Sequence, residues 1–242
     1  MRLFALDESK DLGARIASAF GKDLSDLEHR GFSDGEYKIR PLGPVSGEHV
    51  CIIQSLYGDP VYTVHDKLCR LLFVIATMRD HGATRITALV PFLCYGRKDR
   101  RTKGWDPVTT RYVAQLFEAV GCDDLVTLET HNLAAFQNAF RIRTHHLDLG
   151  CVFPDVITWR TDTEPLVVMS PDPGGVKRAQ LFQQILEDRL GRAVGFGFMD
   201  KRRSAGSMTS GDLVGDFDGK SVIIVDDMIA SGGTMIAAAQ AC

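Results

Sequence analysis

The stretch SVIIVDDMIASGGTM, residues 221–235, joins an apolar run to two adjacent acids, Asp226 and Asp227, and to a loop of small residues. The apolar run is typical of a buried strand, and the alanine-rich run after the loop indicates a helix. Ligands of open α/β sheets collect beyond the carboxyl ends of the strands. The stretch therefore predicts a parallel sheet with a binding site at its edge. The loop consists of Ala230, Ser231, Gly232, Gly233 and Thr234.

The 230–234 loop has the composition of a phosphate-binding turn. Its glycines allow backbone N–H groups to point into one concavity, its hydroxyls are donors, and the helix that follows adds a partial positive charge. The two carboxylates cannot bind phosphate, but they accept hydrogen bonds from sugar hydroxyls or hold Mg²⁺. The combination favours a sugar phosphate. The alternative is a strand-end turn with solvated acids.

Strand-like runs alternate with helical runs along the chain, which predicts mostly parallel sheets covered by helices on both faces. A polar stretch at 28–41 contains a turn signal between two strand-like halves. The predicted strands are 2–6, 49–56, 85–92, 124–131, 165–171, 193–201 and 220–227. The predicted helices are 13–20, 65–82, 106–121, 174–191 and a last one that begins at 233.

The segment 143–165 has no clear periodicity, and we interpret it as an irregular domain boundary. It predicts two α/β domains, residues 1–147 and 148–242. The chain stops in the middle of a helical pattern at Cys242. We therefore expect the second domain to continue beyond this sequence.

Composition excludes several classes of protein. The 242 residues carry a net charge of −3, so neither nucleic acid nor an anionic membrane is favoured as a partner. No apolar run is long enough for a transmembrane helix, and the N-terminus does not have the pattern of a signal peptide. The six cysteines are scattered without a C-x-x-C pair, which predicts free thiols in a cytoplasmic protein and no structural zinc site.

Six motifs resemble, in order and spacing, those of the ribose-phosphate diphosphokinases, or phosphoribosyl pyrophosphate (PRPP) synthetases. The last motif alone is shared with many phosphoribosyltransferases, whereas its combination with FSDGE and DKRR is far more specific. The resemblance covers nearly the whole chain. The motifs are GFSDGE (31–36), IIQS (52–55), PFLCYGRKDRR (91–101), SPDPGGVKRA (170–179), DKRR (200–203) and VDDMIASGGT (225–234).

The resemblance implies two phosphoribosyltransferase-like domains, with ATP on the side of the first and ribose 5-phosphate on the side of the second. The family transfers the β,γ-diphosphoryl group of ATP to the C1 hydroxyl of ribose 5-phosphate. The products are PRPP and AMP, and the reaction requires Mg²⁺. A homo-oligomer, either a dimer or a hexamer, is also implied.

By resemblance, Lys201 and Arg203 are the catalytic pair. Two residues apart on a strand, their side chains point to the same face and could reach one polyphosphate. Diphosphoryl transfer depends mainly on positioning and on cations near developing negative charge. The following Gly- and Ser-rich segment, 204–212, suits a flap that excludes water, although an ordinary surface loop has the same composition.

The resemblance also assigns the binding residues. It places ribose 5-phosphate on the 230–234 loop and on Asp226 and Asp227. His131 and Asp172 match metal-site residues, with a structural histidine and a helix N-cap as the alternatives. Phe32, Asp34 and Glu36 match an adenine pocket that lies on a neighbouring subunit, with a plain hairpin turn as the alternative. The ATP phosphates would contact Arg97, Lys98, Asp99 and His131, unless residues 97–99 form only a solvated loop.

The chain departs from the family pattern in both halves. Ala230 stands where an aspartate is common, Lys98 replaces a glutamine, and Arg70 occupies the position of a glutamate. Residues 129–131 read Glu-Thr-His instead of Asp-Leu-His. Two alternatives to an active synthetase therefore stay open: a non-catalytic regulatory homologue and a phosphoribosyltransferase that uses PRPP.

Overall fold

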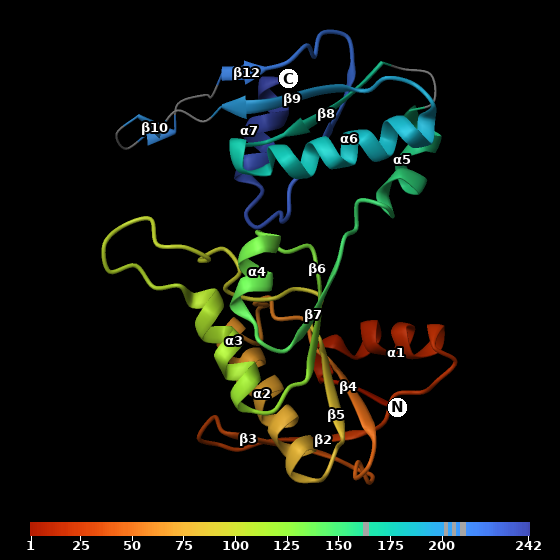
Figure 1. Cartoon of the computed structure of the whole chain (residues 1–242), viewed down its shortest axis with the longest axis vertical. Helices are drawn as coiled ribbons and strands as arrows, with labels where there is room; N and C mark the ends of the chain where they lie inside the picture. The colour runs from red at the N-terminus through yellow and green to blue at the C-terminus, as the bar shows by residue number, and fades with distance from the viewer. Residues whose placement is uncertain (162–164, 201–202, 205–206, 209–211) are drawn as a thin grey trace. The chain divides into compact units, whose positions relative to one another are not determined.

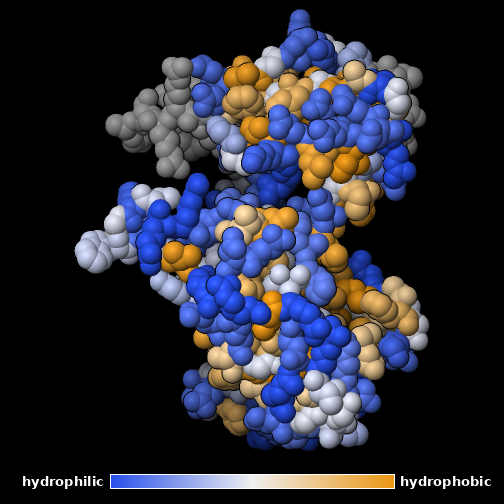
Figure 2. All heavy atoms as spheres, viewed as in Figure 1, coloured by the Kyte–Doolittle hydropathy of each residue, from blue (hydrophilic) through white to orange (hydrophobic). Residues whose placement is uncertain are grey.

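The computed structural model of the chain describes residues 1–161, 165–200, 203–204, 207–208 and 212–242. It divides into two compact units, Met1–Leu147 and Asp148–Cys242 (Figure 1). Among the described helices, none is long and apolar enough to cross a membrane. On the face shown in Figure 2, apolar surface forms separate patches among hydrophilic side chains in each unit.

Unit 1 contains a five-stranded parallel sheet in the order β1-β4-β5-β6-β7. All five carboxyl ends therefore lie at one edge, where loops can gather functional side chains. The predicted parallel sheet is confirmed. Its strands are β1 (Arg2–Ala5), β4 (His49–Ile53), β5 (Arg85–Leu89), β6 (Asp124–Leu128) and β7 (Arg143–Leu147).

Helices cover both faces of the unit 1 sheet (Figure 1). The first lies so close to β1 that a Cβ on Gly13 would come within 2.5 Å of the Cβ of Ala5, and only glycine fits there. The second begins at a capping box between Thr63 and Asp66. The helices are α1 (Lys10–Ala19), which follows the 3-10 turn η1 (Asp7–Ser9), on one side, and α2 (Val64–Asp80), α3 (Thr109–Ala119) and α4 (Leu133–Ala139) on the other.

The polar stretch with the turn signal forms an antiparallel hairpin of β2 (Leu27–Gly31) and β3 (Tyr37–Pro41). It is a separate two-stranded sheet. Ile39 is buried in the main hydrophobic core of unit 1, so the hairpin packs against this core. The turn uses Gly35 at φ +92°, a left-handed conformation that glycine adopts readily.

Unit 2 contains a four-stranded sheet in the order β12-β9-β8-β13, parallel except for β12. Core clusters on its two faces involve α6 and α7. The strands are β8 (Leu166–Ser170), β9 (Gly195–Asp200), β12 (Asp212–Val214) and β13 (Ser221–Ile224), with the short pair β10 (Arg203–Ser204) and β11 (Ser207–Met208) apart. The helices are α5 (Phe153–Thr161), η2 (Pro173–Gly175), α6 (Val176–Leu190) and α7 (Gly233–Ala241).

The prediction of an irregular segment at 143–165 is wrong over much of its length, because it contains strand β7 and helix α5. β7 is a half-exposed edge strand that carries two histidines, so it has no apolar signal to distinguish it from a loop. Helix α5 has exposed apolar residues, including Phe153 and Val156, which blurs its periodicity.

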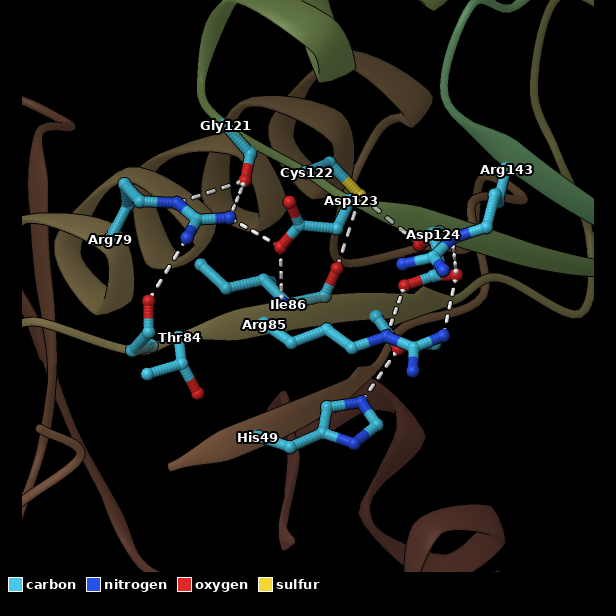
Figure 3. A network of polar contacts seen from close by, with 12 residues as sticks. His49, Arg79, Thr84, Arg85, Ile86, Gly121, Cys122, Asp123, Asp124 and Arg143 are labelled. Atoms are coloured by element: carbon cyan, nitrogen blue, oxygen red, sulfur yellow. Dashed lines mark hydrogen bonds and ion pairs between the residues drawn. The ribbon is translucent and has the colours of Figure 1, made fainter. Parts of the chain in front are cut away.

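Charged side chains join the amino ends of the unit 1 strands (Figure 3). The carboxylate of Asp124, only 1% exposed, accepts hydrogen bonds from Arg85 at 2.7 and 2.8 Å and pairs with Arg143 at 2.9 Å. Beside it, the Asp123 carboxylate accepts from the Ile86 amide at 2.7 Å. The hydrogen bond from Arg85 is the largest factor that lowers the pKa of Asp124.

Replacing Asp124 with asparagine is expected to lower the Tm by a few degrees at neutral pH, because two arginines lose their shared carboxylate. The folded-state pKa of Asp124 lies below the ordinary 3.8, so its stabilisation is present above 3.8 and is lost as the pH falls through the folded value. The difference in Tm between the variant and the wild type should therefore disappear at acid pH. Thermal unfolding measured at neutral pH and at acid pH tests this, with the exposed Asp155→Asn as control. Equal Tm values at neutral pH would refute it.

Candidate functional site

The predicted acid pair lies at the carboxyl edge of the unit 2 sheet. Val225 donates its amide to the carbonyl of Met169 at 2.9 Å, which continues the ladder between β13 and β8. Asp226 and Asp227 follow at once, and Asp172 follows the end of β8. The expectation that both acids sit at a strand end is confirmed.

Two neighbouring carboxylates act on the pKa of Asp226. Burial raises the pKa of Asp226 to about 6, aided by its contact with the Asp227 side chain and by the negative charges of Asp227 and Asp172. The Asp227 amide donates to Oδ1 of Asp226 at 2.8 Å. Arg178 of α6 places Nη1 3.9 Å from Oδ1 of Asp227. Sequence reasoning missed Arg178, although it lies inside the motif SPDPGGVKRA.

The 230–234 loop leads directly into helix α7. Gly232 is the N-cap, with φ +78° and ψ −10°, and its carbonyl accepts the Ile236 amide at 2.9 Å. Only a residue tolerant of the left-handed region fits this position without strain. Ala230 and Ser231 are exposed, and Thr234 is partly buried in the first turn. The loop therefore presents a helix N-terminus next to the acid pair, which is an arrangement suited to an anion.

Asp172 is a helix N-cap, which is one of the two roles that the sequence predicts for it. Its Oδ1 accepts the amides of Gly174 at 2.9 Å and Gly175 at 3.1 Å, at the start of η2. The Ser170 hydroxyl donates to the Asp172 carbonyl at 2.6 Å. These contacts fix a side chain whose charge helps to raise the pKa of Asp226. A metal role for Asp172 stays a prediction.

In unit 1, the loop after β5 carries the predicted phosphate contacts. Arg97 is exposed. Lys98 instead donates Nζ to Oδ2 of Asp106 at 2.6 Å, and this contact is the largest factor that lowers the pKa of Asp106. The same oxygen accepts the amides of Thr102 and Lys103, both at 3.0 Å. Asp106 thus organises the loop, a role that sequence reasoning missed.

Asn132 brings the loop after β5 next to the strand end of β6. Its Nδ2 donates to Oδ2 of Asp99 at 2.7 Å, while its Oδ1 caps α4 by accepting the Ala135 amide at 3.1 Å. His131, its neighbour in the chain, is exposed. Asp99 and His131, 32 positions apart in the sequence, are therefore held at one edge of the sheet.

The residues of the predicted adenine pocket lie at the tip of the β2–β3 hairpin. Asp34 Oδ1 accepts the Glu36 amide at 3.0 Å, and the Phe32 amide donates to the Glu36 carbonyl at 2.8 Å. Phe32 is 44% exposed, with the guanidinium carbon of Arg30 5.4 Å from its ring centroid. The hairpin turn is therefore present, and an exposed aromatic face stands on it.

The predicted catalytic pair can be placed only in part. Lys201 lies outside the described residues, and for Arg203 the structure describes only the backbone, as the first residue of β10. The predicted flap, 204–212, falls largely outside the described part of the chain.

Comparison with known proteins first defines the class. The sequence profile of the phosphoribosyl transferase domain matches residues 156–241, which contain the acid pair and the 230–234 loop. The profile of the N-terminal domain of ribose phosphate pyrophosphokinase matches residues 1–121. Both domains carry phosphoribosyltransferase-type folds, as the sequence predicted.

The chain belongs to the ribose-phosphate pyrophosphokinase family. It is 34% identical to ribose-phosphate pyrophosphokinase 1 of Streptococcus pyogenes, over 100% of this chain and 73% of that protein. The enzyme of the same name from Streptococcus pneumoniae is 33% identical, with the same coverage. The crystal structure of phosphoribosylpyrophosphate synthetase from Mycobacterium smegmatis matches with a TM-score of 0.88 and 30% identity, over 99% of this chain and 75% of that one.

Proposed function

We propose that this protein is an active ribose-phosphate diphosphokinase, which transfers the β,γ-diphosphoryl group of ATP to the C1 hydroxyl of ribose 5-phosphate. The products are PRPP and AMP, for nucleotide biosynthesis. The observation that carries the proposal is the unit 2 strand end, where an acid pair stands beside a loop that opens a helix. The family named above, matched over the whole chain, supports it.

Ribose 5-phosphate is assigned to unit 2. The helix N-terminus behind the 230–234 loop favours the dianionic phosphate, and Ser231 and Thr234 add hydroxyl donors. Asp226 and Asp227 accept hydrogen bonds from the ribose hydroxyls. Ala230 contributes only its backbone to this site, so the aspartate common in the family is not required.

ATP is assigned to unit 1. The planar, permanently charged guanidinium of Arg97 suits phosphate oxygens and is exposed to receive them. Lys98 donates a hydrogen bond to Asp106, so we assign it two roles: it holds the loop in place and adds positive charge near the ATP phosphates. Phe32 stacks on adenine and Asp34 or Glu36 accepts from its amino group, in a neighbouring subunit of a homo-oligomer.

Mg²⁺ fits the carboxylates of unit 2. In the described residues no group of three or more His, Cys, Asp or Glu side chains forms a ready metal cluster. Mg²⁺ does not need one, since it keeps several waters and binds through one or two carboxylates plus substrate phosphates. Within unit 2, Asp172, Asp226 or Asp227 would hold it. In unit 1, we assign His131 to the metal-bound phosphates of ATP. The bound ion would supply charge neutralisation on the diphosphate.

Lys201 and Arg203 are assigned to the transition state. Two cations beside the transferred group stabilise negative charge that develops on its oxygens, and they need no covalent step. Their place in the motif DKRR carries this assignment.

The proposal is tested by the products that the protein forms from ATP, ribose 5-phosphate and Mg²⁺. AMP and PRPP in equal amounts, with no AMP when ribose 5-phosphate is omitted, are expected. Pyrophosphate released from PRPP only in the presence of a nucleobase would instead identify a phosphoribosyltransferase. Binding of ATP without turnover would identify a regulatory homologue.

A further inference from the structure

The β2–β3 hairpin depends on other elements for its position. Within the described part of the chain it pairs with no further strand, and an isolated two-stranded hairpin is only marginally stable in water. Its base is held by the buried Ile39, but residues 31–36 at its tip are all exposed. Tyr37, the residue after Glu36, is where the tip meets helix α2. Whatever fixes Tyr37 therefore fixes the tip.

Arg70 of α2 contacts Tyr37. Its guanidinium carbon lies 4.7 Å from the ring centroid of Tyr37 and 4.0 Å from that of Tyr62, within cation–π range of both. Its Nη1 donates to Oε1 of Glu8 at 2.8 Å. The two charged side chains are only 14% and 6% exposed. Arg70 therefore joins the hairpin to the carboxyl end of β1, which Glu8 follows.

The loop that carries Tyr62 is itself held to α2. Asp59 accepts the Tyr62 amide at 2.8 Å, and its other oxygen lies 2.5 Å from Nζ of the fully buried Lys67. The Lys67 contact is the largest of the causes that lower the pKa of Asp59 to about 2. Arg70 thus contacts two residues outside the hairpin, Glu8 and Tyr62, and its third contact is Tyr37 of the hairpin.

We propose that Arg70 is a positioning residue for the adenine nucleotide, acting through Tyr37 on the hairpin tip; this inference rests on the proposed function. A displaced Tyr37 would move Glu36, whose carbonyl accepts the Phe32 amide. A group that only anchors the adenine binds the ground state and the transition state equally, so its misplacement raises the KM for ATP and leaves kcat unchanged. Lysine would keep the charge of Arg70 but not the flat surface that lies against the rings.

The test compares Arg70→Met and Arg70→Lys with Arg79→Met. Arg79 lies on the same helix and pairs with Asp123 at the opposite edge of the sheet, so its loss lowers stability without touching the hairpin. Arg70→Met is expected to raise the KM for ATP about tenfold, with kcat and the KM for ribose 5-phosphate within about twofold of wild type. The KM for ATP of Arg70→Lys should lie between those of the wild type and Arg70→Met. An unchanged KM for ATP, or an equal rise in Arg79→Met, would overturn the inference.

Amide hydrogen exchange supplies a readout that does not need turnover. In Arg70→Met the amides of residues 31–37 should exchange faster than in wild type, while those of β4 to β6 stay protected. Exchange at the tip equal to wild type would overturn the inference. A wild-type protein that forms no PRPP would end the proposed function, and the exchange result would still decide whether Arg70 positions the hairpin.

Discussion

Replacing Lys201 with alanine should lower turnover by about 10²- to 10³-fold, the range measured when one preorganised transition-state donor is removed. The reason is electrostatic. A diphosphoryl group in transit spreads negative charge over its oxygens, and a lysine ammonium beside it stabilises that charge more than the charge of the bound ATP. The affinity for ribose 5-phosphate should stay within about twofold, because the 230–234 loop and the acid pair are unchanged.

Lys220→Ala is the matched control. It removes a lysine from the same unit, but Lys220 lies at the amino end of β13, away from the acid pair, and pairs with Asp216 at 2.6 Å. Lys201→Arg keeps the positive charge and should recover part of the turnover. Turnover in Lys201→Ala equal to that of Lys220→Ala would remove Lys201 from the chemistry.

Replacing Asp226 with asparagine should lower kcat/KM for ribose 5-phosphate by about 10- to 100-fold. A hydrogen bond to a charged acceptor contributes about 1.5–3 kcal/mol, and the amide replaces the carboxylate that would accept from the ribose hydroxyls. Ribose 5-phosphate titrates near the same pH as Asp226, since a second phosphate pKa is about 6. Wild-type kcat/KM should therefore fall more steeply on acidification than that of the variant. A variant with wild-type kcat/KM would exclude Asp226 from the site.

The same substitution should stabilise the protein without ligands. The pKa of Asp226 is raised from 3.8 to about 6, so between these values the folded state holds a proton that the unfolded chain releases. Stability is therefore lost as the pH rises through this window, and the carboxylate destabilises the fold above it. After allowance for solvent screening, Asp226→Asn should gain about 1 kcal/mol at neutral pH. A Tm at or below that of wild type would contradict this, and Asp216→Asn is the exposed control.

The sequence predicted those features that depend on local pattern. The β13 strand, its acid pair and the glycine loop follow one another in the chain, so the local sequence was enough to predict that they lie together. The helices predicted to close at Gly82 and Gly121 end two residues earlier, at Asp80 and Ala119, and both glycines adopt positive φ just beyond the last turn.

Features that depend on distant residues could not be predicted. The contact of Asp99 with Asn132 joins positions 33 residues apart, and that of Arg70 with Glu8 joins positions 62 apart. Strand β7 was missed because an edge strand needs no apolar face of its own once β6 supplies its hydrogen bonds. In each case the tertiary fold, and not the local pattern, decides the contact.

The measurement that tests the central claim most directly follows the β-phosphate of ATP. The protein would be incubated with Mg²⁺, ribose 5-phosphate and ATP labelled at the β-phosphorus. The account predicts that the label moves to PRPP in step with the formation of unlabelled AMP, because the β- and γ-phosphoryl groups transfer as one unit. Label that stays in ATP, or that appears in ADP, would contradict it.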